Sequence, residues 1–126
     1  MKRYKLSISF KDKRGNIIDL LEKENINAIT FITFNKGAIR GNHFHKKTVQ
    51  WGFVTSGKLL IRSKKLRGKV TQMIIKKGDL FVDEKMESHA IKALQTSEVL
   101  FFTRGPRGGK EYESDTFHLK DLLIDS

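Results

Sequence analysis

The chain has 126 residues, with 25 Lys and Arg against 14 Asp and Glu, a formal net charge of +11, and no cysteine. This length suits one domain with its own core, and the lack of cysteine excludes disulfides and thiolate metal sites. No apolar run approaches the roughly 18 residues of a spanning helix, so we expect a soluble, cytoplasmic protein with no membrane partner.

The positive charges are scattered along the chain, over residues 2–14, 36–47, 58–77 and 104–110, whereas residues 111–125 lean acidic. Many of them lie at turns or alternate with apolar residues, as on the solvated face of a strand. No nucleic-acid-binding motif is present. We therefore expect the charge to attract an anionic small molecule, with no nucleic acid as partner.

Short strands separated by turn residues dominate the pattern, beginning with the alternation of Leu6, Ile8 and Phe10 with polar residues. The predicted strands cover residues 5–10, 26–34, 49–55, 58–63, 70–76, 80–83, 89–94 and 98–103. Residues 18–23 and 118–124 are the only helix-like stretches, and both are short. The spacing predicts one all-β domain over residues 1–126, a sandwich or barrel with its core at about 26–104.

The segment RGNHFHKKTVQW, residues 40–51, is the first candidate site. His43 and His45 are two positions apart, so on a strand they point to the same face. Gln50 can return on the next strand, and His89 opens a later one. Three histidines and an amide oxygen are a plausible ligand set for Fe, Mn, Ni or Zn. The alternative is a strand with two ordinary imidazoles.

The spacing around these histidines resembles the first motif of the cupin superfamily of small jelly-roll barrels. That motif runs from a glycine through five residues to His-x-His, then to an acidic residue, and six residues later to a second glycine. Here Gly37, His43, His45 and Gly57 match, and Gln50 stands at the acidic position.

The second cupin motif is matched in part. Gly78 and His89 have the motif's spacing, whereas Glu84 replaces its proline and Met86 its glycine. The resemblance covers roughly residues 30–105 and implies a jelly-roll barrel in which His43, His45, Gln50 and His89 line one cavity. Glu87, two residues before His89, is a candidate for orienting that imidazole, while Asp83 is assigned to a turn or edge.

A narrower resemblance concerns two groups of metal-independent cupins. The stretch from Arg40 to Gln50 is similar to the dTDP-sugar 3,4-ketoisomerases, and Asp12 to Gly15 with Arg40-Gly41 is similar to the dTDP-deoxysugar 3,5-epimerases. Both groups move protons beside a ketone on a nucleotide-linked sugar. The resemblance implies His43 as the base and His45 as its partner in proton transfer, and a base with a pKa near neutrality suits that task.

The same resemblance implies that Arg40 and Lys47 hold an anionic substrate, and Trp51 can stack on a base or sugar unless it belongs to the core. The epimerases take their acid, a tyrosine, from a late strand. Here residues 98–103 contain none, and the only tyrosines are Tyr4 and Tyr112. His118, in the acidic tail, is expected at the surface.

Three functions follow from these observations. The first is a cofactor-free isomerase or epimerase acting on a nucleotide-sugar in deoxysugar or surface-polysaccharide biosynthesis. The second is a metal-binding cupin that holds a divalent ion with His43, His45, Gln50 and His89. The third is a sugar-nucleotide binding module without catalysis. A homodimer is expected, since small cupins of this kind commonly pair by sheet edges.

Overall fold

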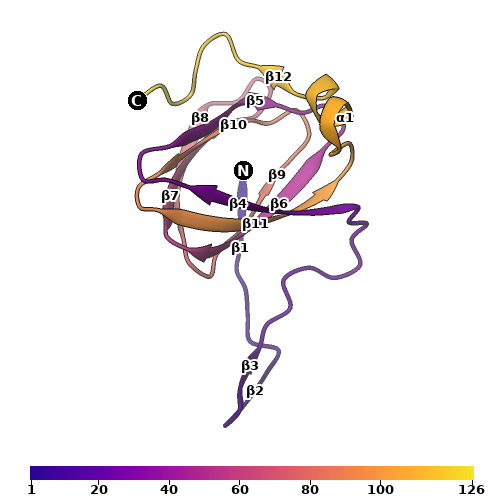
Figure 1. Cartoon of the computed structure of the whole chain (residues 1–126), viewed down its shortest axis with the longest axis vertical. Coiled ribbons are helices and arrows are strands. Elements are labelled where there is room, and N and C mark those ends of the chain that lie inside the picture. The colour runs from indigo at the N-terminus through magenta and orange to yellow at the C-terminus, as the bar shows by residue number, and fades with distance from the viewer.

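The computed structural model describes residues 1–126 and confirms the predicted all-β jelly roll, in which two five-stranded antiparallel sheets face each other (Figure 1). The first sheet has the order β1 (Lys2–Tyr4), β9 (Leu80–Asp83), β6 (Val49–Ser56), β11 (Ser97–Arg104) and β4 (Ala28–Phe34). The second has the order β12 (Phe117–His118), β5 (Ile39–Phe44), β10 (Ser88–Ala93), β7 (Lys58–Lys64) and β8 (Val70–Lys76). A hairpin of β2 (Phe10–Asp12) and β3 (Gly15–Ile17) and one helix, α1 (Gly109–Ser114), complete the chain.

The main core lies between the two sheets, because every second residue of their strands points inward. Its ten buried members come from both sheets: Phe34, Val54, Leu59, Ile61, Ile75, Phe81, Ile91, Ala93, Val99 and Phe101. Gly57 joins β6 to β7 with a φ of 95°, in the left-handed region that favours glycine. A β-carbon at this position would lie 2.1 Å from the Ser97 hydroxyl oxygen, so the turn admits no side chain.

A second apolar cluster lies on the opposite face of the first sheet. Val49, Trp51, Leu80 and Val82 form its buried part. Tyr4, Leu6, Leu21, Ile26, Phe53 and Phe102 pack against it. The N-terminal segment and the connection to β4 therefore cover this face of the sheet.

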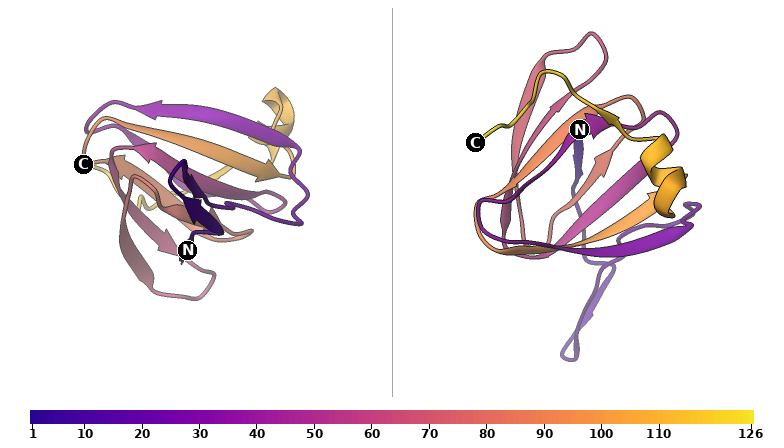
Figure 2. Two further views of the ribbon diagram at one scale, coloured as in Figure 1. Left: turned by 90° about the horizontal axis from the view of Figure 1, so that it is seen from below. Right: turned by 45° about the horizontal axis from the view of Figure 1, so that its top comes forward.

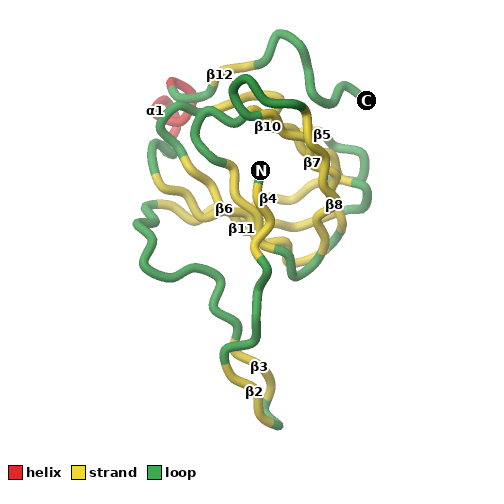
Figure 3. Tube along the Cα trace, turned by 180° about the vertical axis from the view of Figure 1, so that it is seen from behind, coloured by secondary structure: helices red, strands yellow, loops and turns green.

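The β2–β3 hairpin projects away from the two sheets (Figures 1 and 3). Phe10 and Ile17 face each other across it, and their side chains are 52% and 57% exposed. At its tip the Arg14 guanidinium donates to the Asp12 carboxylate at 2.7 and 2.9 Å. The hairpin thus carries apolar side chains that the rest of the chain does not cover.

The two helix-like stretches predicted at residues 18–23 and 118–124 are wrong. The first is an extended connection whose Leu21 packs on the second apolar cluster. The second begins in β12, and its later backbone amides, those of Leu123 and Ile124, donate to the Asn42 side chain instead of forming a helical turn. The single helix, α1, has six residues and is too short to cross a bilayer.

Candidate active site

The interior is divided along the strand direction into an apolar end and a polar end. At the polar end, inward positions of neighbouring strands carry buried polar side chains: His45, Gln50, Ser63, Asp83, His89 and Thr103. Burial of such groups is costly unless they are bonded or serve a function. The polar end is therefore the candidate site.

Three histidines meet at this end and form what we call the histidine site: His43, His45 and His89. The ring centroid of His43 lies 4.8 Å from that of His45 and 4.7 Å from that of His89, and the remaining pair is 5.6 Å apart. One nitrogen of each ring lies within 4.8 Å of the others. The structure thus brings together all three histidines that the sequence analysis selected.

Close approach of β5 to β10 at Gly41 allows this arrangement. Gly41 has a φ of 91°, and a β-carbon there would lie 2.9 Å from the carbonyl oxygen of His89. The register between the strands shifts at this point, between His89 and Ala90. A side chain at position 41 would force the two strands apart and separate His43 from His89.

Backbone carbonyls fix two of the three rings. Nδ1 of His45 lies 2.9 Å from the carbonyl oxygen of Asp115, and Nδ1 of His89 lies 3.3 Å from that of Glu87. Because a carbonyl oxygen only accepts, Nδ1 carries the hydrogen and Nε2 of the neutral ring keeps its lone pair. Nε2 of His45 is buried without a partner, so it is available to accept a proton or to bind an ion.

Burial and repulsion between imidazoles favour the neutral form of His43 and His45. Burial, followed by repulsion from His89, His45 and His118, lowers the pKa of His43 from 6.5 to about 3. Burial also lowers the pKa of His45, outweighing the hydrogen bond to the Asp115 carbonyl. The pKa of His43 in the unliganded site is therefore far below the near-neutral value that suits a base. Both rings are proton acceptors at pH 7.

Asp83 is a site residue that the sequence analysis missed. It lies opposite Gln50 in the β6–β9 pairing, with Oδ2 3.8 Å from Nε2 of His89 and Oδ1 without a partner. Burial raises the pKa of this carboxyl. Gln50 itself donates from Nε2 to the Thr103 hydroxyl at 3.4 Å. The acidic position of the cupin motif is thus neutral, and the neighbouring strand supplies a carboxyl group beside it.

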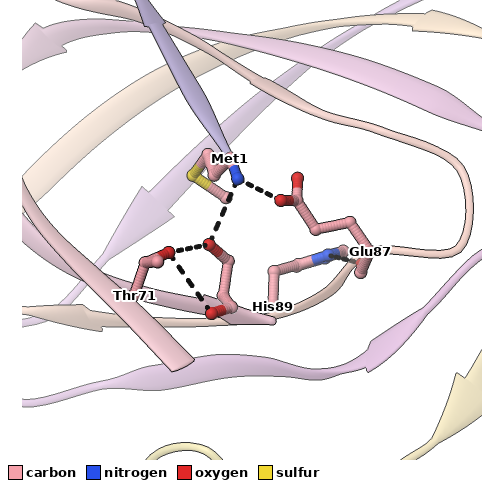
Figure 4. Close-up of polar contacts among 5 residues, drawn as sticks. Met1, Thr71, Glu87 and His89 are labelled. Carbon is pink, nitrogen blue, oxygen red and sulfur yellow. Dashed lines mark hydrogen bonds and ion pairs between the residues drawn. The ribbon is translucent and has the colours of Figure 1, made fainter. Parts of the chain in front are cut away.

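Glu87 contributes to the site through its backbone. Its carbonyl oxygen contacts the His89 ring, whereas its carboxylate forms an ion pair with the amino group of Met1 (Figure 4). The same amino group donates to the Ser63 hydroxyl at 3.3 Å, and Ser63 is 3.0 Å from the Thr71 hydroxyl. The prediction that the Glu87 side chain orients an imidazole is therefore wrong, because its carboxylate pairs with Met1 and only its main-chain carbonyl oxygen contacts the His89 ring.

The C-terminal segment adds an aromatic wall. The Tyr112 ring, on α1, lies 5.2 Å from that of His45, and the Arg107 guanidinium lies 4.4 Å from the centroid of Tyr112. The exposed His118 ring is 6.1 Å from that of His43. Sequence reasoning found no tyrosine near the site, because the late strands contain none and the return of residues 109–118 over the histidines is a long-range contact.

The three predicted substrate-binding residues lie in different places. Arg40 donates to the carbonyl oxygen of Thr33 and stacks over Phe34, near the apolar end. The Lys47 side chain is exposed on the turn that follows His45. Trp51 is 3% exposed within the second apolar cluster, on the opposite face of the sheet from Gln50. Trp51 therefore serves packing, and only Lys47 lies next in sequence to the histidine site.

The structure is a jelly roll whose interior holds three facing histidines at one end, which is the fold that the cupin resemblance implies. The chain belongs to the family described as polysaccharide biosynthesis C-terminal domain, whose model matches residues 10–117. Among proteins of curated function, none matches the sequence.

Solved structures with the same fold have low sequence identity. The 3,4-ketoisomerase QdtA of Thermoanaerobacterium thermosaccharolyticum, in complex with TDP, superposes with a TM-score of 0.76 at 19% identity, over 95% of this chain and 88% of that one. The dTDP-4-dehydrorhamnose 3,5-epimerase of Sulfolobus tokodaii gives 0.72 at 19% identity, over 92% and 77%. The capsular polysaccharide assembling protein CapF of Staphylococcus aureus gives 0.67 at 19% identity, over 94% of this chain but only 33% of that one.

Proposed function

We propose that the protein is a sugar-nucleotide isomerase or epimerase that moves a proton beside a ketone. The observation that carries the proposal is the histidine site itself, in which a neutral His43 contacts two further imidazoles inside a buried polar end. Two solved structures of the same fold support the substrate class. The ketoisomerase QdtA holds TDP in one structure, and a mutant of it holds TDP-4-keto-6-deoxyglucose in another.

In this reaction His43 accepts the C–H proton next to the ketone. The electron pair of that bond moves into the carbonyl group to give an enolate, and the ring becomes an imidazolium. Return of a proton to a different carbon or to the other face of the same carbon gives the isomer, without net oxidation. His45 is positioned to exchange that proton, since its Nε2 is unpartnered and its ring is 4.8 Å away.

The low pKa of His43 applies to the site without an anion. Burial is the largest cause of this low pKa, and repulsion from the imidazoles of His89, His45 and His118 adds to it. A negative ligand acts in the opposite sense, because it favours the charged form of the ring. A bound diphosphate and a developing enolate both favour the imidazolium. The pKa of His43 therefore rises toward the neutral range at the step that needs a base. Lys47, exposed beside the site, supplies a positive charge for the diphosphate.

The test is solvent-deuterium exchange into a panel of 4-keto-6-deoxy sugar nucleotides. His43→Asn should reduce exchange by about 10² to 10⁴, the range for loss of a general base, while binding stays within a few-fold. His118→Asn is the matched control, because it removes an exposed imidazole from the edge of the site. Equal losses in the two variants would contradict the role of His43. If the unaltered protein binds these sugar nucleotides but catalyses no deuterium exchange, the third function, a non-catalytic sugar-nucleotide binding module, is the one that remains.

A second candidate is a metal-binding cupin, favoured by the unpartnered Nε2 of His45 and the mutual distances of the three rings. Two nitrogens on one zinc ion are at most about 4 Å apart, since each bond is about 2.0–2.1 Å. Here the ligand nitrogens of the three histidines lie within 4.8 Å of one another. The rings would therefore have to approach one another only slightly to bind one ion. His43, His45 and His89 therefore fit such an ion, with Gln50 or Asp83 beside them. A bound ion would polarise the substrate ketone as a Lewis acid.

Metal content separates the two candidates. The measurement is elemental analysis of protein purified without added metal or chelator. If the first candidate is right, it should find less than about one tenth of a metal ion per chain, whereas an occupied site would give about one. Exchange should also survive chelator treatment. If the second is right, Fe, Mn, Ni or Zn should be present near one equivalent and should be lost in His43→Asn and His89→Asn alike.

We also propose a homodimer, built on surfaces that this chain leaves uncovered. β4 is an edge strand of the first sheet, and its Ile29 and Phe31 are 65% and 56% exposed. Phe10 and Ile17 of the projecting hairpin are exposed to a similar extent. Burying the exposed part of four such side chains offers about 1–2 kcal/mol each before the cost of association, because each is already partly covered. Light scattering at micromolar concentration should give twice the mass of one chain. The Phe31→Asp variant should give the mass of one chain. A monomeric unaltered protein would refute this.

A further inference from the structure

Beyond the histidine site, the same end of the molecule carries a group of unpaired positive charges. Five exposed cations lie on the turns that join β7 to β8 and β9 to β10: Lys64, Lys65, Arg67, Lys69 and Lys85. None of them forms an ion pair or a side-chain hydrogen bond, and Glu84 is the one exposed acid on these turns. Elsewhere on the surface Arg3, Arg14 and Arg104 have carboxylate partners, and the exposed, unpaired Lys76 and Lys77 at the opposite end have no such number of cations around them.

Two large apolar side chains lie among these cations. Leu66 is 72% exposed, more than any other large apolar residue, and Met86 is 38% exposed. Both line one groove of about 380 Å³ together with Lys65 and Lys85, so the two turns are neighbours. Single exposed leucines are common on protein surfaces. An exposed leucine and methionine side by side among five free cations form an amphipathic surface.

The backbone holds these side chains outward. A turn closed by the hydrogen bond from the Gly68 amide to the Lys65 carbonyl, at 2.8 Å, places Leu66 at its corner, and the loop projects from the body (Figure 2, right). Met86 has a φ of 64°, and its amide donates to the carbonyl oxygen of His45 at 2.7 Å. The exposure of Met86 is therefore fixed by a contact with the histidine site.

We infer that these two turns dock the protein on an anionic lipid bilayer. Lysines and arginines next to a bilayer are attracted to acidic headgroups, and adjacent apolar side chains enter the boundary between headgroups and acyl chains. The sequence-based expectation of no membrane partner, which rested on the lack of a spanning segment, is replaced by this inference, because a peripheral contact needs no such segment. A free diphosphate leaves Leu66 and Met86 without a role, because it offers no apolar phase.

The inference has a geometric consequence. Ser88 and His89 lie directly opposite Lys64 and Ser63 in the pairing of β10 with β7, so the docking turns extend from the strand ends that carry the histidine site. Docking would hold that end of the fold against the bilayer.

The test is co-sedimentation of the full chain with vesicles of phosphatidylcholine alone, or with about one third phosphatidylglycerol. Binding is expected only to the acidic vesicles and should fall as salt is raised. Each cation removed should weaken it about fivefold, so Lys65→Ala with Lys85→Ala should weaken it about 25-fold. Leu66→Ser should weaken it several-fold. Lys76→Ala with Lys77→Ala, the same charge change on the β8–β9 turn at the opposite end, is the matched control.

Three results would overturn the inference: no binding to acidic vesicles, equal binding to neutral ones, or an equal loss in the control pair. A fourth arm adds inorganic pyrophosphate. If pyrophosphate releases the protein from vesicles by saturable binding, and this binding is lost in the Lys65 and Lys85 variant, the turns form an anion subsite and not a docking surface. Deuterium exchange by the Lys65 and Lys85 variant should equal that of the unaltered protein, so failure here leaves the proposed isomerase intact.

Discussion

Asp115 connects the C-terminal segment to the histidine site, and its removal gives the sharpest stability prediction. Its carboxylate, 4% exposed, accepts hydrogen bonds from the amides of Lys46 and Lys47 at 3.0 Å and from the Thr48 hydroxyl at 2.7 Å. Its carbonyl oxygen accepts from His45. Burial alone raises the pKa of Asp115, but the bonds from Thr48, Lys47 and Lys46 outweigh it and the net pKa is lowered.

The magnitude follows from these three bonds. Hydrogen bonds to a charged group contribute about 1.5–3 kcal/mol each, and water can replace part of them because Lys46 and Lys47 are themselves exposed. Asp115→Ala should therefore lower the free energy of unfolding by about 3–4 kcal/mol. Asp115→Asn keeps an acceptor and loses the charge, so about 1–2 kcal/mol is expected. Asp121→Ala, an exposed carboxylate of the same tail, should stay within about 0.5 kcal/mol.

Urea unfolding provides the measurement, with the midpoint shifting at constant slope. An NMR titration gives a second readout. The carboxylate favours the charged form of His45, so Asp115→Ala should lower the pKa of that ring further. A loss of less than about 1 kcal/mol in Asp115→Ala would refute the assignment of the carboxylate as the link between the tail and the β5–β6 turn.

Three further predictions concern stability. Gly57→Ala places a β-carbon 2.1 Å from the Ser97 hydroxyl oxygen at a φ of 95°, so a loss of about 3 kcal/mol or more in urea unfolding is expected. Met86→Gly relieves a φ of 64° and should be neutral or stabilising by up to about 1 kcal/mol, whereas a clear loss would mean that the Met86 side chain packs. In chelator-treated protein, His43 with a folded pKa of about 3 binds no proton between pH 6.5 and 3, while the unfolded chain does. The free energy of unfolding should therefore fall as the pH drops through this window, by at most about 1.4 kcal/mol per unit and about half that for a partly exposed ring. His43→Asn should reduce this slope but not abolish it, because the pKa of His45 is also lowered in the folded chain.

The sequence predicts the central strands of the sheets well because their signal is local, whereas the strand predicted at residues 5–10 is wrong, since of that range only Phe10 lies in a strand. Alternation identifies β7, β10 and β11 nearly to the residue, and the glycines at 37, 57 and 78 mark turns that all have positive φ. Strand alternation puts His43 and His45 on one face, and the resemblance to the two cupin motifs implies that His89 joins them. These contacts depend on pairing between strands that the motif spacing already implies.

What the sequence misses depends on long-range returns of the chain. Asp115 meets His45 across 70 residues, and Tyr112 arrives with it. Asp83 faces His89 because of the register of β9 in the first sheet, which no local pattern gives. The apolar spacing of residues 118–124 resembles a helix, but Asn42 satisfies the backbone amides that a helix would have paired. In each case a tertiary partner outweighs the local preference.

The histidine site also destabilises the fold locally, and the strong contacts around it offset this loss. Nε2 of His45 and Oδ1 of Asp83 are buried without partners, and each such atom costs about 1–3 kcal/mol. Strong contacts lie immediately around them: the Asp115 carboxylate with its three donors, and the Met1 amino group with Glu87. These contacts hold the turns on both sides of the cluster in place, so the unpartnered atoms stay buried instead of relaxing toward water. A site kept ready for a proton or an ion therefore depends on the stability of the tail and the N-terminal strand, although neither supplies one of the three histidines.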